Sequence, residues 1–147
     1  MAQFPGISEY FDILNKSQKI YTRCLEPVCR KWDLTRSELD VLLFLHNNPG
    51  YDRAADIVAH RGMTKSHVSL SVANLQSRGL ILTREDERDR RAVRLSLSEE
   101  GRQIAEQGRV VQDRFFGAVF EGLSREDLHL WQTMVNRVCD NINHIEG

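Results

Sequence analysis

Cysteine and long apolar runs are both scarce in this sequence. Its 147 residues include three cysteines (Cys24, Cys29 and Cys139), too few for a disulfide framework and wrongly spaced for a zinc ribbon. The apolar runs are far shorter than the ~20 residues needed to cross a bilayer. The N-terminus lacks the basic segment and apolar core of a signal peptide. These absences predict a cytoplasmic protein with reduced thiols.

Residue sets with catalytic or metal-binding spacing are absent as well. The nine glycines are expected at helix ends and turns rather than in a phosphate-binding loop. No nucleophile and base form a recognisable pair, and the five histidines show no paired ligand spacing. We therefore expect no enzymatic activity, no metal site and no cofactor.

Charge is balanced over the whole chain but unevenly distributed along it. The 20 Lys+Arg and 21 Asp+Glu give a net charge of −1, which at first argues against a nucleic-acid partner. The segment 57–84, however, contains no acidic residue and carries four basic ones: Arg61, Lys65, Arg78 and Arg84. The near-zero total therefore conceals a basic patch.

The spacing of apolar residues predicts six helices and one hairpin. A first long helix is expected after an N-cap at Ser8, with a kink or break at Pro27. The other helices are expected from a capping box at Thr35–Glu38, over Arg53–His60, from Thr64 to about Arg78, from Ser98 to before Gly122, and from Ser124. Strands are expected at 80–83 and 92–97, around a charged connector at 85–91.

Two helices joined by the turn Arg61-Gly62-Met63 and followed by a hairpin are typical of a winged helix-turn-helix. The predicted fold class is mainly α with a small antiparallel β-wing, flanked by long dimerisation helices. We expect a single domain over 1–147, with the DNA-binding lobe at 33–99 and dimerisation helices at 1–32 and 100–147. A lone chain would leave too much of the apolar face of these helices uncovered.

The outer side of the helix after Thr64 is rich in small polar side chains. Its expected members are Thr64, Lys65, Ser66, His67, Ser69, Ser71 and Asn74. Small hydroxyl groups allow close approach to DNA, and Asn can bind adenine through both groups of its amide. The alternative is a solvated face without a partner, but Ser is a poor helix former, which favours binding.

The connector between the strands alternates in charge. Arginine at a hairpin tip suits the narrow minor groove, and a neighbouring Asp can hold its guanidinium in place. On charge alone, a solvated loop of weak ion pairs explains this segment equally well.

At this point the chain resembles the MarR family of bacterial transcription factors. The wing signature of that family corresponds to Asp86-Glu87-Arg88-Asp89-Arg90-Arg91 and the strand and helix start Leu95-Ser96-Leu97-Ser98-Glu99-Glu100-Gly101. The recognition helix and first wing strand correspond to Thr64-Lys65-Ser66-His67-Val68-Ser69, Leu75 and Gly79-Leu80-Ile81. The resemblance is specific from about Thr35 to Gly101, and the flanking helices match in pattern only.

The resemblance implies a homodimer built by the first, fifth and sixth helices. It implies Arg88 or Arg90 as the minor-groove residue, Asp86 as its brace, and Asp89 with Arg91 as residues that shape the wing. Many relatives carry a basic residue where this chain has Leu70, so a phosphate or guanine contact is missing there or Leu70 touches a thymine methyl. The expected DNA-binding residues are Arg61, Thr64, Lys65, Ser66, His67, Ser69, Leu70, Asn74, Arg78, Arg84, Arg88 and Arg90.

The resulting hypothesis is a homodimeric repressor of a pseudo-palindromic operator that a small phenolic or anionic effector releases. The resemblance places the effector in a cleft for which Tyr21, Arg23, Cys24 and Trp32 are candidate lining residues. One alternative is a redox-sensing regulator of the same fold that uses Cys24 or Cys29. Another is a dimeric interaction protein that does not bind DNA. Trp131 and the pair Phe115 and Phe116 are expected in core or dimer packing rather than in a cofactor site.

Overall fold

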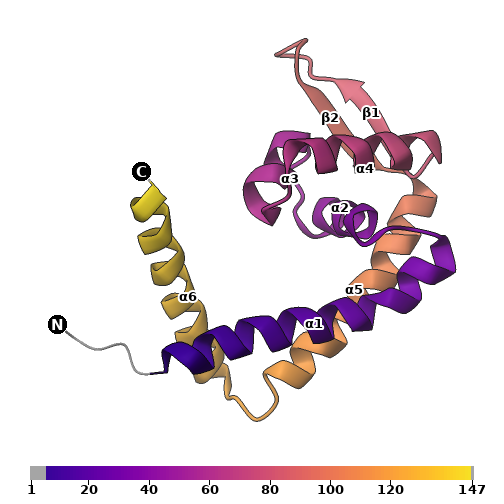
Figure 1. Cartoon of the computed structure of the whole chain (residues 1–147). Helices are drawn as coiled ribbons and strands as arrows, with labels where there is room; N and C mark the ends of the chain where they lie inside the picture. Colours follow the sequence, from indigo (N-terminus) through magenta and orange to yellow (C-terminus); the bar gives the residue numbers. More distant parts are fainter. Residues whose placement is uncertain (1–5, 147) are drawn as a thin grey trace. The chain divides into compact units, whose positions relative to one another are not determined.

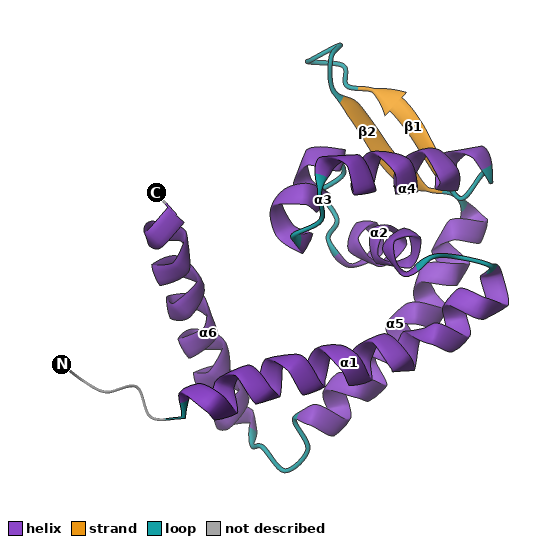
Figure 2. Ribbon diagram, in the orientation of Figure 1, coloured by secondary structure: helices purple, strands orange, loops and turns teal. Residues whose placement is uncertain are grey.

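A computed structural model of the chain describes residues 6–146, and residues 1–5 and 147 lie outside this range, so the expected absence of a signal peptide falls partly on residues that it does not describe. The elements follow in the order α1 (Ile7–Trp32), α2 (Arg36–Asn47), α3 (Ala54–Arg61), α4 (Lys65–Ser77), β1 (Ile81–Glu85), β2 (Val93–Leu97), α5 (Glu99–Val119) and α6 (Arg125–Glu146) (Figure 1). The predicted fold class is confirmed: the described chain is mainly helical with one two-stranded antiparallel sheet (Figure 2). No helix in the described part is long and apolar enough to span a membrane.

The described chain forms two compact units that divide within α5. The first unit runs to Asp113 and the second starts at Arg114. In the first unit α4 packs on α2, α3 and β1, and α2 also contacts α1 and β2 (Figure 1). The hairpin and the helix-turn-helix therefore belong to one packed body.

Local hydrogen bonds fix most helix starts where the sequence predicts them. The Thr35 hydroxyl accepts the Glu38 N–H, and a Glu38 carboxylate oxygen accepts the Thr35 N–H, which completes the predicted capping box. The Thr64 hydroxyl caps α4 by accepting the His67 N–H at 3.1 Å. Ser98 and Ser124 cap α5 and α6 in the same way.

The start of α1 differs from the prediction, and of the two outcomes expected at Pro27 the break does not occur. Ser8 is inside the helix, and the N-cap is Gly6, whose φ of 81° is in the left-handed region that glycine adopts at low cost. Pro27 does not split the helix, which continues to Trp32. Pro27 is exposed, so water can bind the carbonyl that its missing N–H leaves without a donor.

The hairpin forms at the predicted place with shifted ends. β1 and β2 pair antiparallel from Ile81 opposite Leu97 to Glu85 opposite Val93. Gly79 precedes β1 with a φ of 69°, as expected of a glycine that follows a helix. The Leu95 N–H donates to the Asp52 carbonyl at 2.7 Å, which ties β2 to the segment before α3.

The core of the first unit is built around α2. Its buried side chains include Leu39, Leu42 and Phe44, together with Val68 and Leu75 of α4. Ser71 is also buried, contrary to the expected outer position, because 68, 71 and 75 follow the helical spacing of one inward face.

The glycines of α5 correct another expectation, since Gly101, Gly108 and Gly117 lie inside the helix rather than at an end or turn. A Cβ on Gly101 would lie 2.1 Å from the main-chain oxygen of Leu80, and one on Gly108 would lie 2.9 Å from Cδ2 of Leu43. The absence of these side chains lets α5 approach the base of the hairpin and α2 closely.

The second unit contains the end of α5 and all of α6. Phe120 packs edge-to-face on Trp131, with ring centroids 5.8 Å apart, and stacks on Phe116. Trp131 thus contacts Phe120 but is 48% exposed, so its expected role in core or dimer packing stays a prediction. Much of α6 nevertheless exposes apolar side chains, which include Leu128, Leu130, Trp131, Met134, Val138 and Ile142.

Candidate nucleic-acid interface

The predicted helix-turn-helix is formed by α3 and α4. Gly62 ends α3 with a φ of 62°, and Thr64 caps α4 two residues later. The N-terminal main-chain amides of α4 are the part of the helix suited to an anion such as a phosphate. Lys65, Ser66 and His67 in the first turn are all exposed. The turn therefore presents a basic, hydroxyl-bearing helix start to the surface.

All twelve predicted DNA-binding side chains are on the surface. These exposed residues are Arg61, Thr64, Lys65, Ser66, His67, Ser69, Leu70, Asn74, Arg78, Arg84, Arg88 and Arg90. The Arg61 guanidinium lies over the Phe44 ring, 5.2 Å from its centroid, which fixes its side chain at the end of α3. The exposed face of α4 thus lies within the basic, acid-free segment 57–84, and the wing adds the arginines Arg88 and Arg90 that follow this segment.

Two of these residues make hydrogen bonds within the chain that sequence reasoning missed. The Arg78 guanidinium donates to the carbonyls of Trp32 and Asp33 at 2.6 and 2.7 Å, at the C-terminal end of α1. The Asn74 amide nitrogen donates to Oε1 of Glu38 at 3.1 Å. Both side chains therefore connect α4 to the segment between α1 and α2.

Glu38 is the residue that no sequence signal assigned to the site. It is 6% exposed, and its second carboxylate oxygen accepts the Thr35 N–H of the α2 capping box. One buried carboxylate therefore joins the start of α2 to α4. The capping box at Thr35–Glu38 is the sequence signal that draws attention to Glu38. It does not predict the contact with α4, because a capping box whose Glu is exposed has the same sequence.

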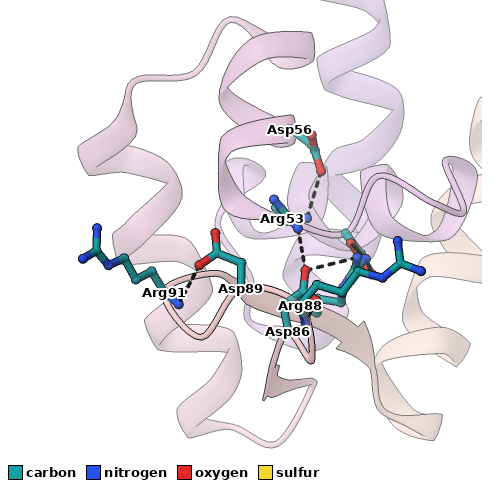
Figure 3. A network of polar contacts seen from close by, with 8 residues as sticks. Arg53, Asp56, Asp86, Arg88, Asp89 and Arg91 are labelled. Atoms are coloured by element: carbon teal, nitrogen blue, oxygen red, sulfur yellow. Dashed lines mark hydrogen bonds and ion pairs between the residues drawn. The ribbon is translucent and has the colours of Figure 1, made fainter.

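The wing is fixed at its base by a buried aspartate. Asp86 is 5% exposed, and its Oδ1 accepts the Arg88 N–H at 3.0 Å (Figure 3). Its Oδ2 pairs with Arg53 of the α3 N-cap and, at 3.2 Å, with Arg94 of β2. The hydrogen bond from the Arg88 N–H is the main reason that the pKa of Asp86 lies below its ordinary value, and Arg53 and Arg94 lower this pKa further.

This arrangement corrects the predicted role of Asp86. The carboxylate was expected to hold the guanidinium of a wing arginine, whereas it accepts the main-chain N–H of Arg88 and pairs with Arg53 and Arg94. The brace therefore acts on the backbone of the wing, because an Asp two residues before an N–H closes a local turn. The sequence does not single out Arg53, because Asp86 lies 33 residues away, or Arg94, whose contact with Asp86 depends on the pairing of the two strands.

The tip of the wing is shaped by Asp89. Its Oδ1 accepts the Arg91 N–H at 3.0 Å, while its carbonyl accepts the Ala92 N–H. The Arg91 guanidinium points away from Asp89 in Figure 3. The two aspartates therefore form successive turns that carry Arg88, Arg90 and Arg91 on a defined backbone.

The candidate effector residues are spread along the C-terminal half of α1. The Tyr21 hydroxyl accepts from Gln112 of α5 at 2.6 Å, and the Trp32 indole N–H donates to Gln107 at 3.0 Å. Arg23 is exposed, whereas Cys24 is half-buried. The structure thus brings Tyr21 and Trp32 to α5 but places Arg23 on another side of α1.

Burial raises the pKa of the Cys29 thiol, and the nearby acids Asp40, Glu26 and Glu38 add to this effect against Arg36. A raised pKa lowers the fraction of reactive thiolate at neutral pH. Among the described residues, no group of three or more His, Cys, Asp or Glu side chains is placed to hold a metal ion.

Comparison with known proteins agrees with this geometry. Residues 32–92 match the model of the MarR family. The chain is 24% identical over 114 residues to the uncharacterized HTH-type transcriptional regulator YdgJ of Bacillus subtilis, a match that covers 78% of this chain and 69% of the relative.

Two solved structures have the same fold. A MarR family transcriptional regulator from Silicibacter pomeroyi superposes with a TM-score of 0.79 at 19% identity, covering 93% of this chain and 90% of that one. A putative MarR family transcriptional regulator from Listeria monocytogenes, complexed with 26mer DNA, superposes with a TM-score of 0.75 at 15% identity, covering 97% and 90%. With the helix-turn-helix and the braced wing, these matches show that the chain has the winged helix fold and that residues 32–92 are similar to the MarR family of transcriptional regulators.

Proposed function

We propose that the protein is a homodimeric repressor that binds a pseudo-palindromic operator and is released from it by a small molecule. The observation that carries the proposal is the union of an exposed, acid-free α4 face with a wing whose backbone is held by Asp86. Complementary positive charge supplies most of the affinity for DNA, and side chains on a helix in the major groove supply the specificity. The solved Listeria relative in complex with DNA supports the use of this fold for that purpose.

In the proposed complex the N-terminal half of α4 enters the major groove. Arg61 and Lys65 contact phosphates, as does Arg84 at the end of the first wing strand. Ser66, His67 and Ser69 approach base edges, and the Thr64 cap directs the first amides of α4 to the DNA backbone.

The wing contacts the adjacent minor groove through Arg88 or Arg90. Arginine is favoured there because the narrow groove concentrates negative potential. Asp86 fixes the main chain at Arg88, so the guanidinium enters the groove from an ordered turn and loses less conformational entropy on binding.

Dimerisation is supported by the apolar surface of the long helices. Large apolar side chains remain about half exposed on α1 and α6, among them Phe11, Leu14, Trp131, Met134 and Val138. Apolar surface of this extent on a single chain is typical of an interface. A twofold dimer spaces two recognition helices about one DNA turn, ~34 Å, apart, which matches a pseudo-palindromic site.

The proposed effector is a small phenolic or anionic molecule that binds beside α1, at Tyr21, Arg23, Cys24 and Trp32. A release mechanism follows from the contacts of α1: Trp32 bonds to α5 and its carbonyl accepts from Arg78 at the end of α4. A ligand that displaces the end of α1 therefore changes the position of the recognition helix. The redox alternative is disfavoured at Cys29, whose raised pKa makes it a poor thiolate sensor.

The test uses the purified full chain and duplexes selected by it from a random-sequence pool. We expect a palindromic consensus, sedimentation as a dimer, and an affinity that falls steeply with added salt. Arg88→Ala or Arg90→Ala should weaken binding, whereas the matched control Arg125→Ala, an exposed arginine at the start of α6, should not.

Three outcomes contradict separate parts of the proposal. Absence of binding at low salt favours the interaction protein, and a monomer that binds one half-site removes the dimer. DNA that stays bound in millimolar 2-hydroxybenzoate, a phenolic carboxylate used as the probe, argues against the proposed effector class.

A further inference from the structure

One line of side chains on α4 points directly away from the protein. Ser66, Leu70, Ala73 and Ser77 are all exposed and follow one another at helical spacings of four, three and four. The buried residues Val68, Ser71 and Leu75 occupy the opposite side of the helix. We call the four exposed residues the α4 ridge; it is the part of the helix that reaches furthest into a groove.

The middle of the α4 ridge is apolar. Leu70 is 60% exposed and Ala73, three residues on, is exposed as well. Single exposed leucines are common on protein surfaces and need no explanation. Leu70 differs because it directly follows Ser66, His67 and Ser69, the residues that the proposed function assigns to base edges.

Three polar side chains that follow Ala73 on α4 are occupied within the chain. Asn74 donates to Glu38, and Gln76 donates to the Thr83 hydroxyl at 3.1 Å. The Ser77 hydroxyl donates to the Asn74 carbonyl, so it is turned back onto its own helix. The C-terminal half of α4 therefore offers apolar surface rather than free amide groups.

Base recognition in the major groove has few chemical options. Guanine is recognised by Arg or Lys, and adenine by both amide groups of Asn or Gln. Asn74 and Gln76 would have to break the hydrogen bonds described above, and Arg78 donates to the carbonyls at the end of α1. A feature of the groove that suits the large apolar side chain of Leu70 is the C5 methyl group of thymine, which is itself apolar.

We infer that Leu70, with Ala73 beside it, forms a subsite for the C5 methyl group of thymine and makes thymine a specificity determinant of the operator half-site. This inference rests on the proposed placement of α4 in the major groove. It assigns specificity to a nonpolar contact at a position without a charged side chain.

The experiment replaces thymine by uracil, which differs only in lacking this methyl group. The duplex selected by the full chain is synthesised with uracil at one thymine position at a time, and binding is measured by fluorescence anisotropy. We expect one or two positions in each half-site at which uracil weakens binding by about fourfold, the effect of burying one methyl group. In Leu70→Ala the same substitutions should have little effect, because the variant no longer covers the methyl.

Two variants serve as controls. Leu70→Met keeps an apolar side chain and should keep the sensitivity to uracil. Leu82→Ala removes a leucine that is 54% exposed but lies on β1, outside the α4 ridge, and should leave the pattern unchanged. Since Leu70 is exposed, its variants should have the thermal unfolding midpoint of the unmodified chain.

The possible failures are distinguishable. If the chain selects no DNA, the proposed function and this inference both fall. If it binds its selected DNA but no uracil substitution weakens binding, the inference alone is wrong. If Leu70→Ala stays as sensitive as the unmodified chain, the methyl is recognised elsewhere and Leu70 is not its subsite.

Discussion

Gly101→Ala is expected to destabilise the protein, because Gly101 carries the closest approach between α5 and the base of the wing. A Cβ there would lie 2.1 Å from the Leu80 oxygen, so the two main chains must separate by roughly 1.3 Å to restore an ordinary 3.4 Å contact. Neither atom can turn away, unlike the end of a side chain. The same oxygen accepts the Ser98 N–H at 3.1 Å, and this bond weakens as the chains separate.

The magnitude follows from three effects. Overpacking against main chain costs about 1–3 kcal/mol, and loss of the Ser98 hydrogen bond costs about 1 kcal/mol more. The change from Gly to Ala within a helix returns about 0.5–1 kcal/mol. The free energy of unfolding should therefore fall by about 1–3 kcal/mol. Urea denaturation followed by circular dichroism measures this change at a fixed protein concentration.

Two glycines of the same helix are matched controls. An added Cβ at Gly117 meets nothing within 4 Å, so Gly117→Ala should stabilise the protein by about 0.5–1 kcal/mol. Gly108→Ala should fall between the two, because its 2.9 Å contact is with the movable end of the Leu43 side chain. If Gly101→Ala unfolds at the same urea concentration as the unmodified chain or a higher one, the close approach does not constrain the wing and the reasoning is refuted.

Three further predictions concern the wing, the α1–α4 contact and the thiols. Asp86→Asn should weaken DNA binding by disordering the turn at Arg88. Since the pKa of Asp86 is lowered in the fold, its contribution to stability is present at neutral pH and lost as the pH falls below about 4, where thermal unfolding of the variant and the parent should converge. Arg78→Gln should lower the free energy of unfolding by about 1 kcal/mol and leave the salt dependence of DNA binding unchanged. Lys65→Gln should instead reduce the slope of log affinity against log salt concentration by about 1. A reduced slope in the Arg78 variant with unchanged stability would show that Arg78 contacts a phosphate. Cys29 should be alkylated at pH 7 more slowly than free cysteine, as peptide mass spectrometry can measure, and rapid labelling would restore the redox alternative.

Structural features that depend on a few neighbouring residues were predictable from the sequence. The caps at Thr35, Thr64, Ser98 and Ser124 are each made between residues three apart, so the pattern of hydroxyl residues is sufficient to locate them. The glycine after α3 was predictable for the same reason. The order of helices and hairpin then follows, because each local signal agrees with its neighbours.

The wrong predictions at Ser8, Ser71 and Gly101 each have a different physical cause. Ser8 resembled an N-cap, but Gly6 reaches the left-handed conformation and starts α1 earlier. Ser71 was assigned to the surface by its hydroxyl, although the helical period places it inward with Val68 and Leu75. Gly101 is expected at a helix end or turn, yet it lies within α5, and its close approach to the main chain of Leu80 is visible only in the tertiary structure.

The sequence by itself determined that this chain is a winged helix protein with a basic, hydroxyl-rich helix and an arginine-bearing wing. Only the tertiary structure decided which of those side chains remain available to a partner. Asn74 and Arg78 are indistinguishable from DNA-binding residues in the sequence, because their partners lie more than thirty residues earlier in the chain. A hydrogen bond between distant segments forms only when packing brings them together, and it determines whether a polar side chain faces the protein or its ligand.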